Sequence, residues 1–235
     1  MNDFSWGQLL NPEFYINFEL GGIRLGIYVV LLIVFAETGL FAGFFLPGDS
    51  LLFLSGIYSR DLVQELFTIE SDFLNVFVLG CLVSLAGIIG NEVGYWFGRK
   101  SGPFLYSRKD TLIFKKKYLF KARDFYEQYG GGTIIFARFL PIIRTFAPIV
   151  GGIVQMNKAK FVLFNIVGSM AWSFSLIFAG HYLYKFFLKT INFDLKEHIE
   201  IIVLGIVIVT TAPVLFKLFF GKSKNSEDYE DSEKK

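Results

Sequence analysis

Four ionisable side chains lie in stretches that are otherwise apolar enough to enter a membrane. They are Glu37, Asp49, Arg138 and Arg144. A charged side chain at the centre of a bilayer costs about 2.5–3.5 kcal/mol on insertion scales, so each of the four needs a partner or a ligand. A guanidinium group presents planar donors that match a phosphate in bidentate fashion, and it keeps its charge. We therefore expect Arg138 and Arg144 to bind an anion such as a phosphate group.

The two carboxylates predict a switch for this anion site. Glu37 and Asp49 would compete with a phosphate for the arginines, and would release them when protonated or when bound to a cation. Two other interpretations stay open. The four charges could form a static brace that transports nothing, since buried ion pairs are often structural. Alternatively, the acids could bind a small cation or drug for export, with the arginines only positioning them.

The composition is typical of an integral membrane protein. Of the 235 residues, 53% are hydrophobic, whereas soluble domains have an apolar share of roughly 45–50%. Cys81 is the single cysteine, and His181 and His198 are the two histidines, so we expect no disulfide, metal site or cofactor. No histidine lies near the charged stretches to act as acid or nucleophile, which argues against an enzyme. The first twenty residues contain no Lys or Arg, so no cleavable signal peptide is expected.

Four apolar runs are long enough, or nearly so, to cross about 30 Å of hydrocarbon as helices. They are about Leu20–Ala36, Phe73–Phe97, Phe161–Tyr184 and Ile199–Phe220. Residues 1–19 are expected to form an interfacial segment, and residues 20–220 one membrane domain. The last residues, 221–235, are predicted to be a disordered cytoplasmic tail by composition.

Two further apolar stretches are interrupted and are predicted to form re-entrant hairpins. They comprise residues 37–58 and residues 133–153. Each half of such a stretch has about ten residues and spans about 15 Å as a helix, half of a bilayer. The expected bends are at Pro47, Gly48, Pro141 and Pro148. Non-helical backbone at that depth is tolerated where protein or a wet cavity covers it.

The loop charges predict the orientation. Residues 99–123 hold nine Lys or Arg against one acid, Asp110, which predicts a cytoplasmic link under the positive-inside rule. With four crossings, both termini are then cytoplasmic and the two hairpins enter from opposite leaflets. Oppositely inserted broken elements are typical of a transporter's central site. The expected fold is therefore an all-α integral membrane protein with four transmembrane helices and two oppositely inserted hairpins, a pseudo-inverted repeat.

Polar residues on the third span extend this pattern. Asn165, Ser169 and Ser173 recur every four residues, and Thr145 follows Arg144. These residues could line a wet path beside Arg144 or merely bond to neighbouring helices, and the sequence favours neither alternative.

Glycines recur every four residues near the end of the second span, which leaves one helix face without side chains. They are Gly90, Gly94, Gly98 and Gly102. Such a face predicts close packing of another helix. Glu92, between these glycines, is expected to be a surface residue that either snorkels to the membrane interface or pairs with Arg99; a role in proton relay is the alternative.

Several motifs occur together in the chain. They are Glu37 with Pro47-Gly48-Asp49, then Gly90-Asn91 with Gly94-Tyr95 and Gly98-Arg99, then Phe136-Ala137-Arg138-Phe139 with Pro141, Arg144-Thr145 and Gly151-Gly152. In this combination, which covers roughly residues 30–185, the chain resembles the DedA family, also described as the SNARE-associated or VTT-domain superfamily. By motif match, the resemblance implies that Glu37, Asp49, Arg138 and Arg144 are essential.

The resemblance also implies a function. Members are described as multi-pass inner-membrane proteins with two re-entrant hairpins that move lipids between leaflets. Some are assigned as flippases of undecaprenyl phosphate; others are linked to phosphatidylethanolamine or to broad scrambling. Their activity is associated with the proton motive force or sodium. We therefore expect a bacterial inner-membrane flippase for a phosphate-bearing lipid, with membrane lipids and protons or sodium as partners, no nucleic acid, and a homo-oligomer as an open alternative.

Overall fold

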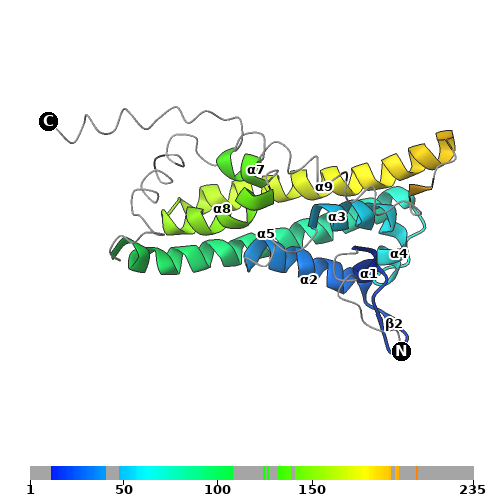
Figure 1. Cartoon of the computed structure of the whole chain (residues 1–235), viewed down its shortest axis with the longest axis horizontal. Coiled ribbons are helices and arrows are strands. Elements are labelled where there is room, and N and C mark those ends of the chain that lie inside the picture. Colours follow the sequence, from blue (N-terminus) through cyan, green and yellow to red (C-terminus); the bar gives the residue numbers. More distant parts are fainter. Residues whose placement is uncertain are drawn as a thin grey trace.

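The computed structural model describes residues 12–40, 48–107, 124, 126, 132–138, 141–191, 194, 195 and 205. This part of the chain is mostly helical, as predicted (Figure 1). After the short helix α1 (Pro12–Ile16) comes a hairpin of β1 (Glu19–Leu20) and β2 (Ile23–Arg24). Its turn residues Gly21 and Gly22 have φ angles of +61° and +83°, which favour glycine. The first apolar helix therefore begins at Gly26 rather than at the expected Leu20.

Two long helices, α5 (Asp72–Ser107) and α9 (Lys158–Ile191), pack against each other along the molecule (Figure 1). Each contains a segment of 33 residues that is long and apolar enough to cross a membrane. Asp72 at the start of α5 accepts a hydrogen bond from Lys185 near the end of α9 (Oδ2 to Nζ, 2.5 Å), so the helices are antiparallel. They contain the predicted second and third spans. The predicted fourth span, 199–220, lies outside the described residues except for Gly205.

Five shorter helices surround this pair. They are α2 (Gly26–Gly39), α3 (Gly48–Ile57), α4 (Ser59–Gln64), α7 (Gly132–Arg138) and α8 (Pro141–Ile153). α2 and α8 pack against α5, whereas α3 and α7 pack against α9. Each long helix thus contacts one short apolar helix from the first half of the chain and one from the second half.

Both proline-containing apolar stretches are divided into short helices. α2 ends at Gly39 and α3 begins at Gly48; the expected bend residue Pro47 lies outside the described residues. α7 ends at Arg138 and α8 begins at Pro141. Proline suits the first turn of a helix because its missing N–H would have no partner there.

Pro148, which was expected at a bend, instead lies inside α8. A proline in a helix interior removes one backbone hydrogen bond and disfavours the helix. Here the segment is pressed against the glycine face of α5: a Cβ on Gly98 would overlap the backbone of Ile149, and one on Gly94 would meet the ring of Pro148 at 3.5 Å. We attribute the continuity of α8 through Pro148 to this packing.

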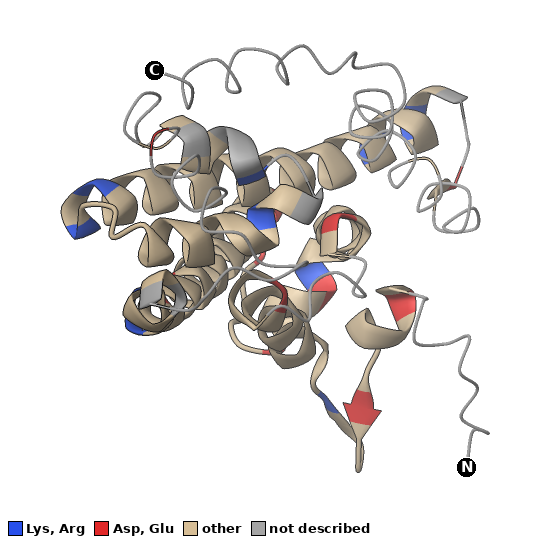
Figure 2. Cartoon of the chain, turned by 60° about the vertical axis from the view of Figure 1, so that its left-hand side comes forward, with Lys and Arg blue, Asp and Glu red and all other residues tan. Residues whose placement is uncertain are grey.

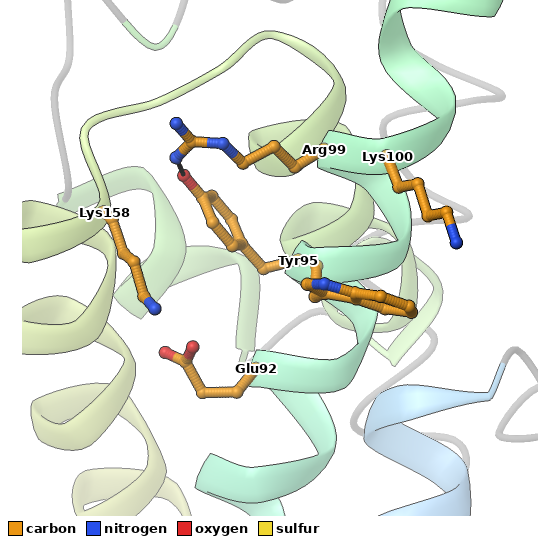
Figure 3. A pocket seen from close by; sticks show the side chains of 6 residues that line it. Glu92, Tyr95, Arg99, Lys100 and Lys158 are labelled. Atoms are coloured by element: carbon orange, nitrogen blue, oxygen red, sulfur yellow. Dashed lines mark hydrogen bonds between the residues drawn. The ribbon is translucent and has the colours of Figure 1, made fainter.

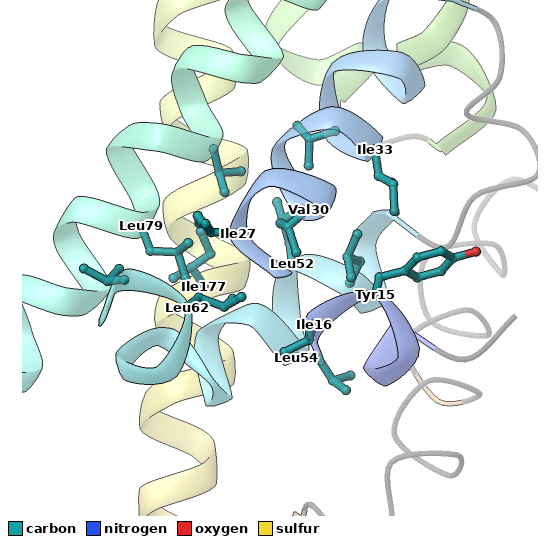
Figure 4. Close-up of a cluster of buried hydrophobic side chains, with 14 of the residues drawn as sticks. Tyr15, Ile16, Ile27, Val30, Ile33, Leu52, Leu54, Leu62, Leu79 and Ile177 are labelled. Carbon is teal, nitrogen blue, oxygen red and sulfur yellow. The ribbon is translucent and has the colours of Figure 1, made fainter. Parts of the chain in front are cut away.

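A cluster of buried aliphatic side chains holds the N-terminal helices against the long pair (Figure 4). It contains Ile16 of α1, Ile27 and Val30 of α2, Leu52 and Leu54 of α3, Leu62 of α4, Leu79 of α5 and Ile177 of α9. Burying an aliphatic side chain of this size contributes about 1.5–3 kcal/mol. The cluster therefore fixes α2 and α3, the two helices that carry Glu37 and Asp49.

Charge is nearly absent from the middle of the long helices (Figure 2). No Asp, Glu, Lys or Arg occurs between Asp72 and Glu92 of α5, or between Lys160 and Lys185 of α9. Large apolar side chains on the outside of both helices are exposed, such as Leu85 and Leu163. This pattern is expected for helices surrounded by lipid. The charges inside the bundle therefore come from the shorter helices.

Candidate functional site

Arg144 holds both predicted carboxylates at once. Its Nη2 donates a hydrogen bond to Oε1 of Glu37, in the last turn of α2, and its Nη1 donates to Oδ1 of Asp49, in the first turn of α3. Glu37 is fully buried, and Arg144, in α8, is 7% exposed. Charge-assisted hydrogen bonds of this kind are roughly twice as strong as neutral ones. Arg144 thus joins the two halves of the chain at the centre of the bundle.

Arg138 has a different environment. This residue ends α7 and is 3% exposed, and its Nη1 donates to Oδ1 of Asn165 at 3.2 Å. Its Nε and Nη2 are buried and have no hydrogen-bond partner among the residues that the structure describes. Among the described residues, no carboxylate lies within ion-pairing distance of Arg138. The four charged residues therefore do not form two ion pairs. Arg144 pairs with both acids, and Arg138 pairs with neither.

Trp172 of α9 lies between the two arginines and was not identified from the sequence. The guanidinium carbons of Arg138 and Arg144 lie 5.3 Å and 4.9 Å from the centre of its ring, within the range of a cation–π interaction. Its Nε1 also donates to Oδ1 of Asp49 at 3.0 Å. The available sequence signal was its place between Ser169 and Ser173 on α9.

Asn165 is the principal hydrogen-bond partner of Arg138. Besides Arg138, its Oδ1 accepts from Nδ2 of Asn91 at 2.7 Å and from Oγ of Ser169 at 3.2 Å. Its Nδ2 donates to the backbone carbonyl of Ile88 at 3.1 Å. This network connects α5, α7 and α9, and it fixes the Asn165 amide so that its oxygen faces Arg138.

The remaining polar residues expected near the site differ in their surroundings. Ser173 lies 2.5 Å from Ser84 of α5, oxygen to oxygen, and so joins the two long helices away from the arginines. Thr145 is buried next to Arg144 in α8. The polar stripe of α9 therefore belongs to the site only at Asn165 and Ser169, and at Ser173 it is a helix–helix contact.

Two glycines make room for the charged groups. A Cβ on Gly48 would overlap the carboxylate of Glu37, and a Cβ on Gly87 of α5 would lie 2.6 Å from Nη2 of Arg138. Even so, Oε2 of Glu37 and Nε of Arg144 have no hydrogen-bond partner within the described ranges of the chain. Buried polar atoms without partners are rare and mark places where a proton, water or ligand is expected. The site thus offers unused donors from both arginines and an unused acceptor on Glu37.

A metal centre is not evident in the described part of the chain, where no group of three or more His, Cys, Asp or Glu side chains could hold an ion. The chemistry of the site is therefore that of guanidinium donors, carboxylate acceptors and an aromatic ring. Such groups can bind an anion and exchange a proton.

The chain is similar to bacterial membrane proteins. A family model, described as the VTT domain, matches residues 30–182. Protein DedA of Escherichia coli (strain K12) is 38% identical over 197 residues, which are 83% of this chain and 84% of that protein. An uncharacterized membrane protein of Mycobacterium tuberculosis (strain ATCC 25618 / H37Rv) is 38% identical over 186 residues, 79% of this chain and 75% of that protein.

A further similarity covers less of the chain. Undecaprenyl phosphate transporter A of Bacillus subtilis (strain 168) is 33% identical over 101 residues, 41% of this chain and 51% of that protein. No solved structure matches the chain.

Proposed function

Because the chain belongs to the VTT-domain family, the DedA family of bacterial membrane proteins, we propose that it moves a phosphate-bearing lipid between the leaflets of the inner membrane. The headgroup passes between the arginines while the lipid tail stays in the bilayer. The observation that carries this proposal is the buried guanidinium of Arg138, with two unused donor atoms and no carboxylate partner among the described residues. A phosphate supplies the acceptors that these donors lack.

Arg144 and its two acids form the coupling switch in this mechanism. With Glu37 and Asp49 ionised, both acids occupy Arg144. When a carboxylate takes up a proton or binds sodium, Arg144 loses an anionic partner and the site gains positive charge. A phosphate then binds between Arg144 and Arg138. Loss of the proton or sodium ion restores the ion pairs and expels the phosphate.

The proposed membrane topology has four crossings and two re-entrant hairpins. α3 has 10 residues and α8 has 13, so they are about 15 Å and 20 Å long, too short to cross about 30 Å of hydrocarbon. α5 and α9 are each long enough to cross. The other two crossings are assigned to residues 199–220 and to α2, whose 14 residues, about 21 Å, cross where the bilayer is locally thinner. In this proposal Asp49 and Arg138 lie at the tips of the two hairpins near the bilayer midplane, and the basic charge of the link 99–123 supports a cytoplasmic position for both termini.

Undecaprenyl phosphate is the substrate that we favour. Its terminal phosphate presents three oxygens free of a second ester, which suits the donors of two arginines. A relative over part of the chain is named an undecaprenyl phosphate transporter. Phosphatidylethanolamine has a single phosphate diester and an ammonium group, so it gives the arginines fewer acceptors and adds a cation.

The test is leaflet-resolved lipid transfer in vesicles that contain the purified protein, with and without a pH gradient. Undecaprenyl phosphate is compared with phosphatidylethanolamine, and the variant is Arg144→Lys. Lysine keeps the charge but loses the planar donors, so we expect transfer of undecaprenyl phosphate to fall at least about tenfold, as for the loss of a charged hydrogen bond. The control is Arg24→Lys, the same change at an exposed residue of β2, with transfer unchanged.

Equal transfer in protein-containing and empty vesicles for every lipid would reject the flippase function. Faster movement of phosphatidylethanolamine than of undecaprenyl phosphate would make phosphatidylethanolamine the substrate instead. Full lipid transfer by Arg144→Lys would show that the planar guanidinium is not required, and would reject the phosphate-binding role of Arg144.

A further inference from the structure

A second charged site lies where the C-terminal part of α5 meets the start of α9 (Figure 3). It is a cavity of about 420 Å³. Its lining residues are Glu92, Tyr95, Trp96, Arg99, Lys100 and Lys158. Three of these side chains are basic and one is acidic, so the cavity has an excess of positive charge. In the described part of the chain, the side-chain hydrogen bonds of Arg138 and Arg144 go to Asn165, Glu37 and Asp49, and not to any residue of this cavity.

The basic groups of this cavity are available to a ligand. Arg99 donates to the hydroxyl of Tyr95 at 3.1 Å, and that hydroxyl donates to the carbonyl of Met156 at 2.6 Å. Lys158 and Arg99 have no carboxylate within ion-pairing distance among the described residues. The expected pairing of Glu92 with Arg99 is therefore not present. The Tyr95 contact orients the guanidinium of Arg99 without neutralising it.

Glu92 and Lys158 face each other across the cavity from α5 and α9 (Figure 3). Lys100 points away from them, and its ammonium lies 5.1 Å from the ring centre of Trp96. Oε1 of Glu92 is buried and has no hydrogen-bond partner among the described residues. Within that part of the chain, the cavity thus presents two cations that no carboxylate pairs, Arg99 and Lys158, together with one carboxylate oxygen that lacks a donor.

The cavity includes an exposed aromatic side chain. Trp96, which lines it, is 61% exposed, and Phe97 and Phe104 are also exposed on this part of α5. Tryptophan with an apolar body and a polar edge is typical of the membrane–water interface. A ligand with a charged head and an apolar tail therefore fits this place better than a free ion in water.

The cavity is close to the central site along both long helices. Glu92 follows Asn91 directly in α5, and Lys158 precedes Asn165 by seven residues in α9, about 10 Å at helical rise. Asn91 and Asn165 are hydrogen-bonded to each other, and Asn165 accepts from Arg138. A headgroup in the cavity would thus lie about two helical turns from Arg138.

We propose that this cavity is a docking station for the phosphate of a lipid headgroup, bound by Arg99 and Lys158 at the membrane interface. The proposal rests on the proposed function, since the docked lipid is the one that passes on to Arg138. Glu92 keeps the binding weak by repelling the phosphate and attracting Lys158. A transport pathway needs sites that bind well enough to receive a ligand and weakly enough to release it.

The experiment measures which lipid lies next to Trp96. The protein is placed in phosphatidylcholine nanodiscs that contain phosphatidic acid with brominated chains, which quench nearby tryptophan fluorescence. Brominated phosphatidylcholine at the same mole fraction gives the quenching expected if lipids are distributed at random. The fluorescence of the Trp96→Phe variant, which comes from Trp6 and Trp172, is subtracted to leave the Trp96 signal. We expect phosphatidic acid to be enriched about fivefold at Trp96 for each basic contact.

Four variants locate the effect. Lys158→Gln should lower the enrichment about fivefold, whereas Lys160→Gln, a matched change at an exposed residue of α9 outside the cavity, should leave it unchanged. Glu92→Gln should raise it. Arg138→Gln should leave the enrichment of phosphatidic acid unchanged while abolishing lipid transfer. The enrichment therefore tests the cavity, and the transfer assay tests the proposed function separately.

Other results would overturn the proposal. Quenching equal to that of brominated phosphatidylcholine would mean that no headgroup is selected, as would equal losses in Lys158→Gln and Lys160→Gln. Inorganic phosphate that competes as strongly as the lipid would make free phosphate the ligand. Preference for brominated phosphatidylethanolamine, lost in Glu92→Gln, would make this a site for an amine-bearing headgroup instead.

Discussion

Arg138 donates a hydrogen bond of 3.2 Å to the side-chain oxygen of Asn165. A neutral amide thus occupies the position where an ion pair would otherwise neutralise this arginine. The contact holds the guanidinium in place while leaving its charge for a ligand. In contrast, Arg144 is bound by two carboxylates. The two arginines therefore have different roles in the proposed mechanism.

Replacing Asn165 by Asp tests the importance of that neutral partner. Asn165→Asp has nearly the same shape and gives Arg138 a carboxylate at about the same position. A phosphate would then have to displace a buried ion pair, so we expect lipid transfer to fall at least about tenfold. The check is transfer in reconstituted vesicles. As a control, Ser169→Ala removes another hydrogen bond to Asn165 without adding charge, and should retain most of the transfer; equal losses in both variants would contradict the assignment.

Trp172 is expected to stabilise the site in two separable ways. Trp172→Phe removes the hydrogen bond to the Asp49 carboxylate and keeps an aromatic face, so the free energy of unfolding should fall by about 1.5–3 kcal/mol. Trp172→Leu also removes both cation–π contacts, which should cost about 2 kcal/mol more in this buried setting. Thermal unfolding in detergent would order the proteins as wild type, Phe variant, Leu variant. The same midpoint for the two variants would show that the aromatic face contributes nothing.

Gly87 is expected to be necessary for the position of Arg138. In Gly87→Ala, the new Cβ would lie 2.6 Å from Nη2 of Arg138, so the guanidinium must move away from Asn165. We predict at least about a tenfold loss of transfer, equivalent to about 1.4 kcal/mol. Gly151→Ala is the matched control, since its Cβ would meet no atom closer than the 3.9 Å to Phe161. Equal activity of the two variants, at equal protein levels, would exclude this role of Gly87.

The sequence pattern singled out the charged residues of this region, but it did not predict how they pair. Apolar runs with isolated charges identified Glu37, Asp49, Arg138 and Arg144, and the structure brings three of them into direct contact. The one-sided pairing could not be predicted, because it depends on α8 lying beside the ends of α2 and α3 while α7 packs against α9. Trp172 was missed for a related reason: an aromatic residue in an apolar span looks like any lipid-facing or core residue until the arginines are placed over it.

The sequence predicted some of the local backbone features and missed others. The breaks near Gly48 and Pro141 follow from the chemistry of glycine and proline, whereas the continuity of α8 through Pro148 depends on contacts with α5. The β1–β2 hairpin has a glycine pair as its signal, which the apolar run from Leu20 obscured. The polar stripe of α9 has a constant spacing, yet only contacts with α5 and α7 separate Asn165 from Ser173.

The central claim is that carboxylates and a phosphate compete for the same arginines, and affinity for the lipid tests it most directly. The measurement is the dissociation constant of undecaprenyl phosphate for the purified protein in nanodiscs, comparing wild type with Glu37→Gln at one pH above neutrality. The glutamine removes a competing charge and leaves the ionisation of the lipid phosphate the same in both samples. We predict that Glu37→Gln binds at least about tenfold more tightly, as for the removal of one charged hydrogen bond to Arg144, and that its affinity varies less with pH than that of the wild type. Unchanged or weaker binding by Glu37→Gln would contradict the account, because the acids would then brace the arginines without competing for them.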